Sequence, residues 1–274
     1  MAPSKTVAIT TARGISCQVR VWDQPEHGAS AIPIVFFHSV AGLFDDEPML
    51  DELGKRYEVY APVWPGFGAE PGEELIDDML DFTLHGWDVV SYLEAEAGFN
   101  APHLVGHGMG AMIAAEMAAV APRQFDRLAL LDPVGLWVDA HPCPDVFTMM
   151  PFEFPEYLFS DGPKGVALLA GGLDFEDPKA IENFLVNNSR RLGTAGKILF
   201  PIPNRRLSKR LYRVTDPTAL IWGAQDRLVP VDPYAAAWQA AIPHAALTVI
   251  EGAGHMVNQE QPVAAAEAIK AHLG

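Results

Sequence analysis

Residues 104–112 read Leu-Val-Gly-His-Gly-Met-Gly-Ala-Met, and this stretch decides the fold. A short apolar run precedes the glycines, and an alanine-rich helical pattern follows them. The spacing is that of a nucleophile elbow, in which G-x-S-x-G holds a serine on a tight turn between strand and helix. The outer positions require glycine because the turn leaves no room there for a Cβ atom. Gly106 and Gly110 meet this demand, and Gly108 stands at the nucleophile position.

The same glycines also suggest a dinucleotide-binding turn or an ordinary glycine-rich loop. They do not fit the fingerprint G-x-G-x-x-G, because the third glycine comes one residue early and residue 111 is alanine. The elbow is therefore the better interpretation, and the rest of the chain has to support it.

Composition limits the classes of function. The 274 residues are enough for one large domain with an insertion, and 49% hydrophobic residues with 20% charged residues are typical of a soluble globular protein. A net charge of −16 argues against nucleic acid as a partner. Two cysteines, Cys17 and Cys143, suit a reducing compartment, and the longest apolar stretch is interrupted by Glu116. We expect a cytoplasmic protein with a small-molecule partner, no membrane contact and an undefined oligomeric state.

Strand-like and helix-like segments alternate along most of the chain, which predicts an α/β fold with a mostly parallel sheet. Eight strands are expected at residues 7–11, 17–22, 32–37, 57–61, 103–105, 128–131, 218–222 and 246–250. Helices are expected at residues 47–55, 73–97 and 233–241, directly after the elbow, and from about residue 261. Between residues 134 and 212 this alternation of strands and helices is absent, and frequent prolines separate short helical segments. We therefore predict a core made of residues 1–133 and 213–274, with residues 134–212 inserted as a helical cap.

Two further loops carry residues suited to catalysis. Asp226 follows the strand expected at 218–222, and His255 follows the last expected strand within Gly-Ala-Gly-His. The carboxyl ends of parallel strands meet at one edge of a sheet, where ligands bind. The elbow, Asp226 and His255 should therefore converge, in the chain order nucleophile, acid, histidine.

Over nearly its whole length the sequence resembles capped serine hydrolases of the α/β-hydrolase fold. The resemblance rests on the elbow, on His38-Ser-Val-Ala-Gly42, on residues 62–68 with Pro-Gly-Phe-Gly, and on Gly-x-Gly-His at 252–255. It implies that Asp226 orients His255, that His255 acts as general base, and that the N–H groups of Val40 and Met109 form an oxyanion hole. His38 and Ser39 would border the substrate.

The resemblance implies hydrolysis of an ester, lactone, amide or carbon–carbon bond in a small, largely apolar molecule. Several aromatic residues of the expected cap would line an apolar pocket or simply form the core of the cap: Trp137, Phe147, Phe152, Phe154, Tyr157 and Phe159. No set of histidines and carboxylates has the spacing of a metal site, and we expect neither a metal nor a cofactor.

Two positions depart from the family pattern. Ser39 replaces the usual glycine after the histidine, and Gly108 replaces the nucleophile. The missing nucleophile has three explanations: a serine replaced by design, a natural loss that leaves a binding protein, or chemistry that uses only the His255–Asp226 dyad, as in cofactor-free oxygenases or lyases. An ancestral aspartate, as in dehalogenases or epoxide hydrolases, is less favoured than serine. Met109 stands where dehalogenases often carry tryptophan, and the proline of the epoxide-hydrolase loop is absent.

Residues 190–213 hold eight of the 19 lysines and arginines, and no Asp or Glu. Such a stretch is either a face that docks onto an acidic core or a positive entrance for an anionic substrate.

Overall fold

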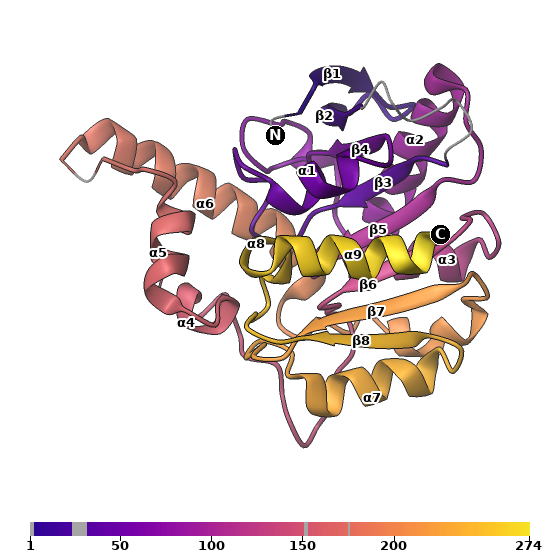
Figure 1. Cartoon of the computed structure of the whole chain (residues 1–274). Coiled ribbons are helices and arrows are strands. Elements are labelled where there is room, and N and C mark those ends of the chain that lie inside the picture. Colours follow the sequence, from indigo (N-terminus) through magenta and orange to yellow (C-terminus); the bar gives the residue numbers. More distant parts are fainter. Residues whose placement is uncertain (1–2, 24–31, 151–152, 175) are drawn as a thin grey trace.

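The computed structural model describes residues 3–23, 32–150, 153–174 and 176–274. Its centre is an eight-stranded sheet with the order β1-β2-β4-β3-β5-β6-β7-β8 (Figure 1). The strands are β1 (Lys5–Thr10), β2 (Ser16–Trp22), β3 (Ile34–Phe37), β4 (Val59–Pro62), β5 (His103–His107), β6 (Leu128–Leu131), β7 (Thr218–Gly223) and β8 (Ala246–Ile250). The pairs β1–β2 and β2–β4 are antiparallel and the other neighbours are parallel. The predicted mostly parallel sheet is confirmed.

Helices cover both faces of this sheet (Figure 1). One face carries α1 (Pro48–Gly54), α8 (Val257–Glu260) and α9 (Pro262–Leu273), and the other carries α2 (Met79–Ala97), α3 (Met109–Val120) and α7 (Val231–Ala241). Strand side chains alternate between the two layers: Ile34 and Phe36 pack with α1, whereas Val35 and Phe37 pack on the α2 side. Continuously apolar strands are what a sheet buried on both faces requires.

The long helix expected at residues 73–97 is interrupted. A short 3-10 turn, η1 (Glu73–Leu75), comes first, and then the backbone is extended at the buried Ile76. The Asp78 side chain accepts hydrogen bonds from the N–H groups of Leu80 and Asp81, so α2 begins only after this cap. Burial of Ile76 and the local cap outweigh the helical periodicity that the sequence suggests.

Between β6 and β7 the described residues form three helices that stand to one side of the sheet in Figure 1. They are α4 (Phe154–Leu158), α5 (Gly162–Ala170) and α6 (Pro178–Leu199), followed by the 3-10 turns η2 (Leu207–Lys209) and η3 (Leu211–Arg213). Each helix has a proline in its first turn, where the missing N–H costs nothing. The side chains of Asp161 and Asp177 cap α5 and α6. The prolines of this segment therefore start helices as well as ending them.

The basic stretch 190–213 lies against the core. Arg190 pairs with Glu73 at 2.8 Å, and Arg210 donates to Glu116 on α3 at 2.9 Å. Other cations donate to backbone carbonyl oxygens, namely Lys197 to Glu73 and Ile76, Arg205 to Lys197, Ile198 and Phe200, and Arg213 to Ala119 and Val120. Most of these charges hold the inserted segment in place. Among the described residues, no helix is both long enough and apolar enough to cross a bilayer.

Candidate active site

The 104–112 stretch forms a sharp turn between β5 and α3. Gly108 has φ 53° and ψ −111°, a backbone conformation in the left-handed half of φ that glycine adopts readily. A Cβ atom at Gly106 would lie 2.6 Å from the carbonyl oxygen of Gly110, and one at Gly110 would lie 2.1 Å from that of Phe37. Both outer glycines are therefore sterically required, as the motif predicts.

Asp226 and His255 meet beside this turn. His255 Nδ1 lies 2.8 Å from Asp226 Oδ2, and both side chains are buried. Asp226 Oδ1 accepts hydrogen bonds from the N–H groups of Leu228 and Val229, which leaves Oδ2 aimed at the imidazole. A Cβ atom at Gly108 would stand 3.0 Å from His255 Nε2. The structure thus brings together the three predicted positions, with His255 between the acid and the turn.

His107 contributes to this arrangement from the residue before the turn. Its Nε2 lies 2.7 Å from the carbonyl oxygen of His255, and the two rings are 5.3 Å apart. Burial lowers the pKa of His107 to about 3, so the ring is neutral and its Nε2–H donates to that carbonyl. This bond fixes the main chain that carries His255. Nothing in the sequence alone pointed to this hydrogen bond.

A second carboxyl group, Asp132, lies beside Asp226 and was not recognised from the sequence. It follows β6, is fully buried, and accepts a 2.8 Å hydrogen bond from Gly223 N–H through Oδ1. Burial, and then the nearby Asp226, raise the pKa of Asp132 well above its usual value. Its position after a strand at the same sheet edge was the available signal. Asp132, Asp226 and His255 form the one cluster in the described part of the chain that could hold a metal ion, and within it His255 Nδ1 is hydrogen-bonded to Asp226 Oδ2.

The 38–42 loop forms the opposite wall of the turn. Val40 and Met109 both line the cavity at His255, and within the described residues neither backbone N–H donates to a protein acceptor. The Cβ atom of Ser39 lies 3.1 Å from the place of a Cβ at Gly108, and Ser39 Oγ accepts from Ala41 N–H. Two free N–H groups beside position 108 suit stabilisation of an oxyanion.

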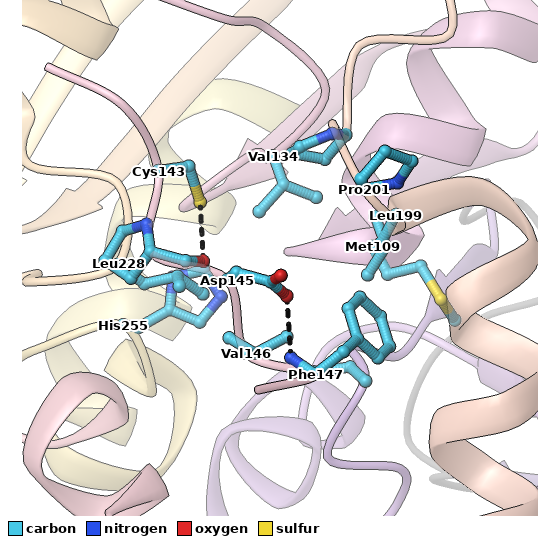
Figure 2. A pocket seen from close by; sticks show the side chains of 13 residues that line it. Met109, Val134, Cys143, Asp145, Val146, Phe147, Leu199, Pro201, Leu228 and His255 are labelled. Carbon is cyan, nitrogen blue, oxygen red and sulfur yellow. Dashed lines mark hydrogen bonds between the residues drawn. The ribbon is translucent and has the colours of Figure 1, made fainter. Parts of the chain in front are cut away.

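The cavity next to His255 is narrow and mostly apolar (Figure 2). Its free volume is about 30 Å³, room for about one or two water molecules. Besides His255, the polar groups in its wall are the Asp145 carboxylate and the Cys143 thiol, and burial raises the pKa of that thiol to about 12. The rest of the lining is apolar and consists of Val40, Met109, Val134, Pro144, Val146, Phe147, Leu199, Pro201, Pro203 and Leu228. Asp145 and Leu228 had no distinguishing signal in the sequence.

The other predicted binding residues are placed differently. Phe147 lines the cavity, whereas Trp137 and Tyr157 do not. The Trp137 indole N–H instead donates a hydrogen bond to Asp139. His38 is buried away from the cavity: its Nε2 accepts from Trp64 N–H and its Nδ1 donates to Ser39 O. Burial lowers the pKa of His38 to about 4. Of the remaining aromatic residues, Phe154 borders a neighbouring cavity, Phe159 is buried, and Phe152 lies outside the described residues.

Glu260 ties the inserted segment to the histidine loop. Its carboxylate accepts hydrogen bonds from Gly254 N–H at 2.6 Å, from Ser160 N–H at 2.9 Å and from Ser160 Oγ. Met256 N–H donates to Leu158 O at 2.9 Å. The turn after α4 therefore lies directly on the loop that carries His255.

Comparisons with known proteins identify the family and the fold. The model of the alpha/beta hydrolase family matches residues 27–268. The dihydrolipoyllysine-residue acetyltransferase component of the acetoin cleaving system from Cupriavidus necator is 28% identical in an alignment of 263 positions that covers 90% of this chain but only 65% of that protein. A solved "probable hydrolytic enzyme" from Pseudomonas aeruginosa PAO1 superposes with a TM-score of 0.75 at 19% identity, covering 98% of this chain and 94% of that one. A 2-hydroxy-6-oxo-6-phenylhexa-2,4-dienoate hydrolase from Rhodococcus sp. strain RHA1 superposes with a TM-score of 0.68 at 19% sequence identity. The match covers 98% of this chain and 99% of that one.

Proposed function

Because the chain belongs to the alpha/beta hydrolase family, we propose that its site is built to hydrolyse an ester, lactone, amide or carbon–carbon bond in a small, largely apolar molecule. The observation that carries this proposal is the line from Asp226 through His255 to position 108, with 2.8 Å between the first two groups. Residues 134–212 would act as the cap over the site, since their loop at 143–147 supplies much of the cavity wall.

The chemistry follows from the positions of the donors and acceptors. With a hydroxyl at position 108, His255 Nε2 would remove its proton as the oxygen attacks the substrate carbonyl carbon. The N–H groups of Val40 and Met109 would stabilise the resulting oxyanion. The proton would then pass from His255 to the leaving group, and a water activated by His255 would release the acyl group. Asp226 stabilises the imidazolium that forms in both steps.

The substitution Gly108→Ser tests this proposal. We expect it to raise hydrolysis of short activated esters at least about a hundredfold and to create a site for covalent labelling by organophosphonates. The new Cβ would meet Ser39 Cβ at 3.1 Å and His255 Nε2 at 3.0 Å, so these side chains must move by a few tenths of an ångström.

Gly108→Ala is the matched control, because it adds the same Cβ without the hydroxyl and should stay inactive. His255→Ala in the Gly108→Ser background should abolish the gain. A folded Gly108→Ser protein that neither turns over esters nor labels at residue 108 would contradict the serine-hydrolase proposal.

A second candidate uses the dyad alone. His255 lines the cavity, and its Nε2 has no hydrogen-bond partner within the described residues, so it is available to deprotonate a substrate or a water. This candidate requires weak activity in the unmodified chain that His255→Ala removes. Activity that survives His255→Ala would exclude it.

A further inference from the structure

A second, more open cleft lies on the other side of the 38–42 loop. Its wall includes Arg20 on β2, Arg191 and Asn188 on α6, and Ala41 and Gly42 of the loop. Its free volume is about 230 Å³. Within the described part of the chain no acidic side chain lines it, although the protein as a whole carries a net charge of −16. A cleft with two arginines on so acidic a protein is a local reversal of charge.

Both arginines lack an anionic partner among the described residues. Arg20 donates to the carbonyl oxygen of Phe44, and Arg191 donates to Ala41 O at 2.8 Å and to Asn188 Oδ1, all neutral acceptors. The Arg191 Nε–H is buried and has no acceptor in the described structure. The arginines at 190 and 210, by contrast, are each paired with a glutamate.

Glu47 interacts electrostatically with Arg20, but it does not supply the missing negative charge. Burial raises the pKa of Glu47 to about 8, so it is mostly protonated at neutral pH. Its oxygens already accept from Phe44 N–H and from the Gln259 amide. A partly buried guanidinium without a counter-ion is costly, and an anionic ligand would offset that cost.

We propose that this cleft binds the phosphate group of a ligand. Two guanidinium groups carry two positive charges, which match a phosphate dianion better than a single carboxylate. The planar fork of arginine also fits the oxygens of phosphate in a bidentate manner. The cleft is large enough for the group and its first carbons, and the side chains of Asn187 and Asn188 add polar lining.

The cleft and the cavity at His255 are neighbours, because an intermediate cavity shares wall residues with each of them. Val40 lines both the catalytic cavity and an intermediate apolar cavity, and Arg191 lines both that intermediate cavity and the cleft. Apolar side chains dominate the intermediate cavity: Phe154, Leu158, Leu169, Phe184 and Leu192. If the proposed hydrolase function holds, on which this step rests, the substrate is an apolar molecule with a phosphate at one end and the bond to be cleaved at the other.

Calorimetric titration of the unmodified chain tests the cleft without any turnover. Hexyl phosphate is expected to bind at least tenfold more tightly than hexanoate, and hexanol is expected not to bind. Arg20→Gln and Arg191→Gln should each weaken phosphate binding at least tenfold. Arg206→Gln is the matched control, because Arg206 is an exposed arginine of the same segment outside the cleft, and it should leave the affinity unchanged.

Each alternative result has a definite meaning. Hexanoate binding as tightly as hexyl phosphate, no phosphate binding, or binding indifferent to Arg20→Gln would each overturn the proposal. Arg191→Lys keeps the charge and should restore part of the affinity, which separates loss of charge from loss of folding. Flotation with vesicles carrying dialkyl phosphate should show no binding, since the net charge opposes an anionic surface. Phosphate binding with an inactive Gly108→Ser protein would leave the cleft standing while the hydrolase proposal fails.

Discussion

Asp132 and Asp226 lie side by side at the ends of β6 and β7, both buried, with ligand atoms of the pair and of His255 all within 4.8 Å of one another. Asp226 Oδ1 accepts hydrogen bonds from two backbone N–H groups, and Asp226 Oδ2 is hydrogen-bonded to His255. By contrast, Asp132 Oδ2 has no hydrogen-bond donor in the described structure. Two adjacent buried carboxyl groups cannot both carry a charge cheaply. Asp132 is therefore the protonated member, and its O–H is free to donate towards Asp226.

The protonated state of Asp132 predicts how stability depends on pH. Its pKa is raised in the folded state, so its stabilising effect is complete below the unfolded value near 3.9 and is lost as pH rises towards the folded value. The substitution Asp132→Asn removes the ionisable group, and with it the loss of stability that the unmodified chain shows as pH rises. The variant's stability relative to the unmodified chain should improve steadily as pH rises above the unfolded value near 3.9, measured by urea unfolding at a series of pH values.

Asp132→Leu provides the comparison. Leucine has a similar volume but leaves Gly223 N–H without its acceptor, so it should destabilise the fold by about 1–3 kcal/mol, whereas asparagine retains an acceptor. Parallel pH curves for Asp132→Asn and the unmodified chain would show that Asp132 is ionised instead.

His85 on α2 predicts sensitivity to acid. It is fully buried, neither ring nitrogen has a partner in the described structure, and burial, with a smaller effect of Arg13, lowers its pKa to about 4. A lowered histidine pKa means that stability is present above pH 6.5 and is lost as pH falls towards 4. At pH 5 the loss is about 2 kcal/mol, from roughly 1.5 pH units.

His85→Leu should therefore gain about 2 kcal/mol over the unmodified chain on going from pH 8 to pH 5, as measured by unfolding in urea at both pH values. The exposed His141 serves as the control position, where the same replacement should give no such change. An equal effect of His85→Leu at both pH values would assign its influence to packing rather than to protonation.

The ion pair of Arg210 with Glu116 predicts a structural role for the basic stretch. Glu116 is only 8% exposed, and removal of Arg210 leaves its carboxylate without that partner. Since Arg210 itself is about one-third exposed, Arg210→Ala should cost about 2 kcal/mol, less than the full loss for a deeply buried pair. Thermal unfolding measures this, and Arg206→Ala should change stability by less than about 0.5 kcal/mol.

A double-mutant cycle separates the pair from its surroundings. Adding Glu116→Gln to Arg210→Ala should recover part of the lost stability, because the uncompensated charge is then gone. Additive losses from the two changes would mean that the pair itself contributes little.

The sheet was predictable because its strands are apolar runs ended by polar or glycine-rich loops, as at 218–222. The convergence of Asp226 and His255 followed from parallel topology, since both come after strands of the same sheet. Asp132 was not predicted as part of the site because an acidic residue after a strand is common. Its contact with Asp226 depends on the tertiary structure. The choice of Phe147 over Trp137 for the cavity wall depends on how residues 134–150 fold back on the core, and no sequence periodicity predicts this.

The free volume of about 30 Å³ at His255 has a kinetic consequence. Any ligand larger than a water or two needs a wider form of the cavity, and the 143–147 loop in its wall is held by the hydrogen bond from Phe147 N–H to Asp145 Oδ1. The intrinsic dissociation constant is then divided by the fractional population of that wider form, so the observed affinity is lower than the intrinsic one. The observed binding rate should level off at high ligand concentration, at the opening rate of the protein itself. A change that loosens the 143–147 loop would then accelerate capture without adding a single contact to the ligand.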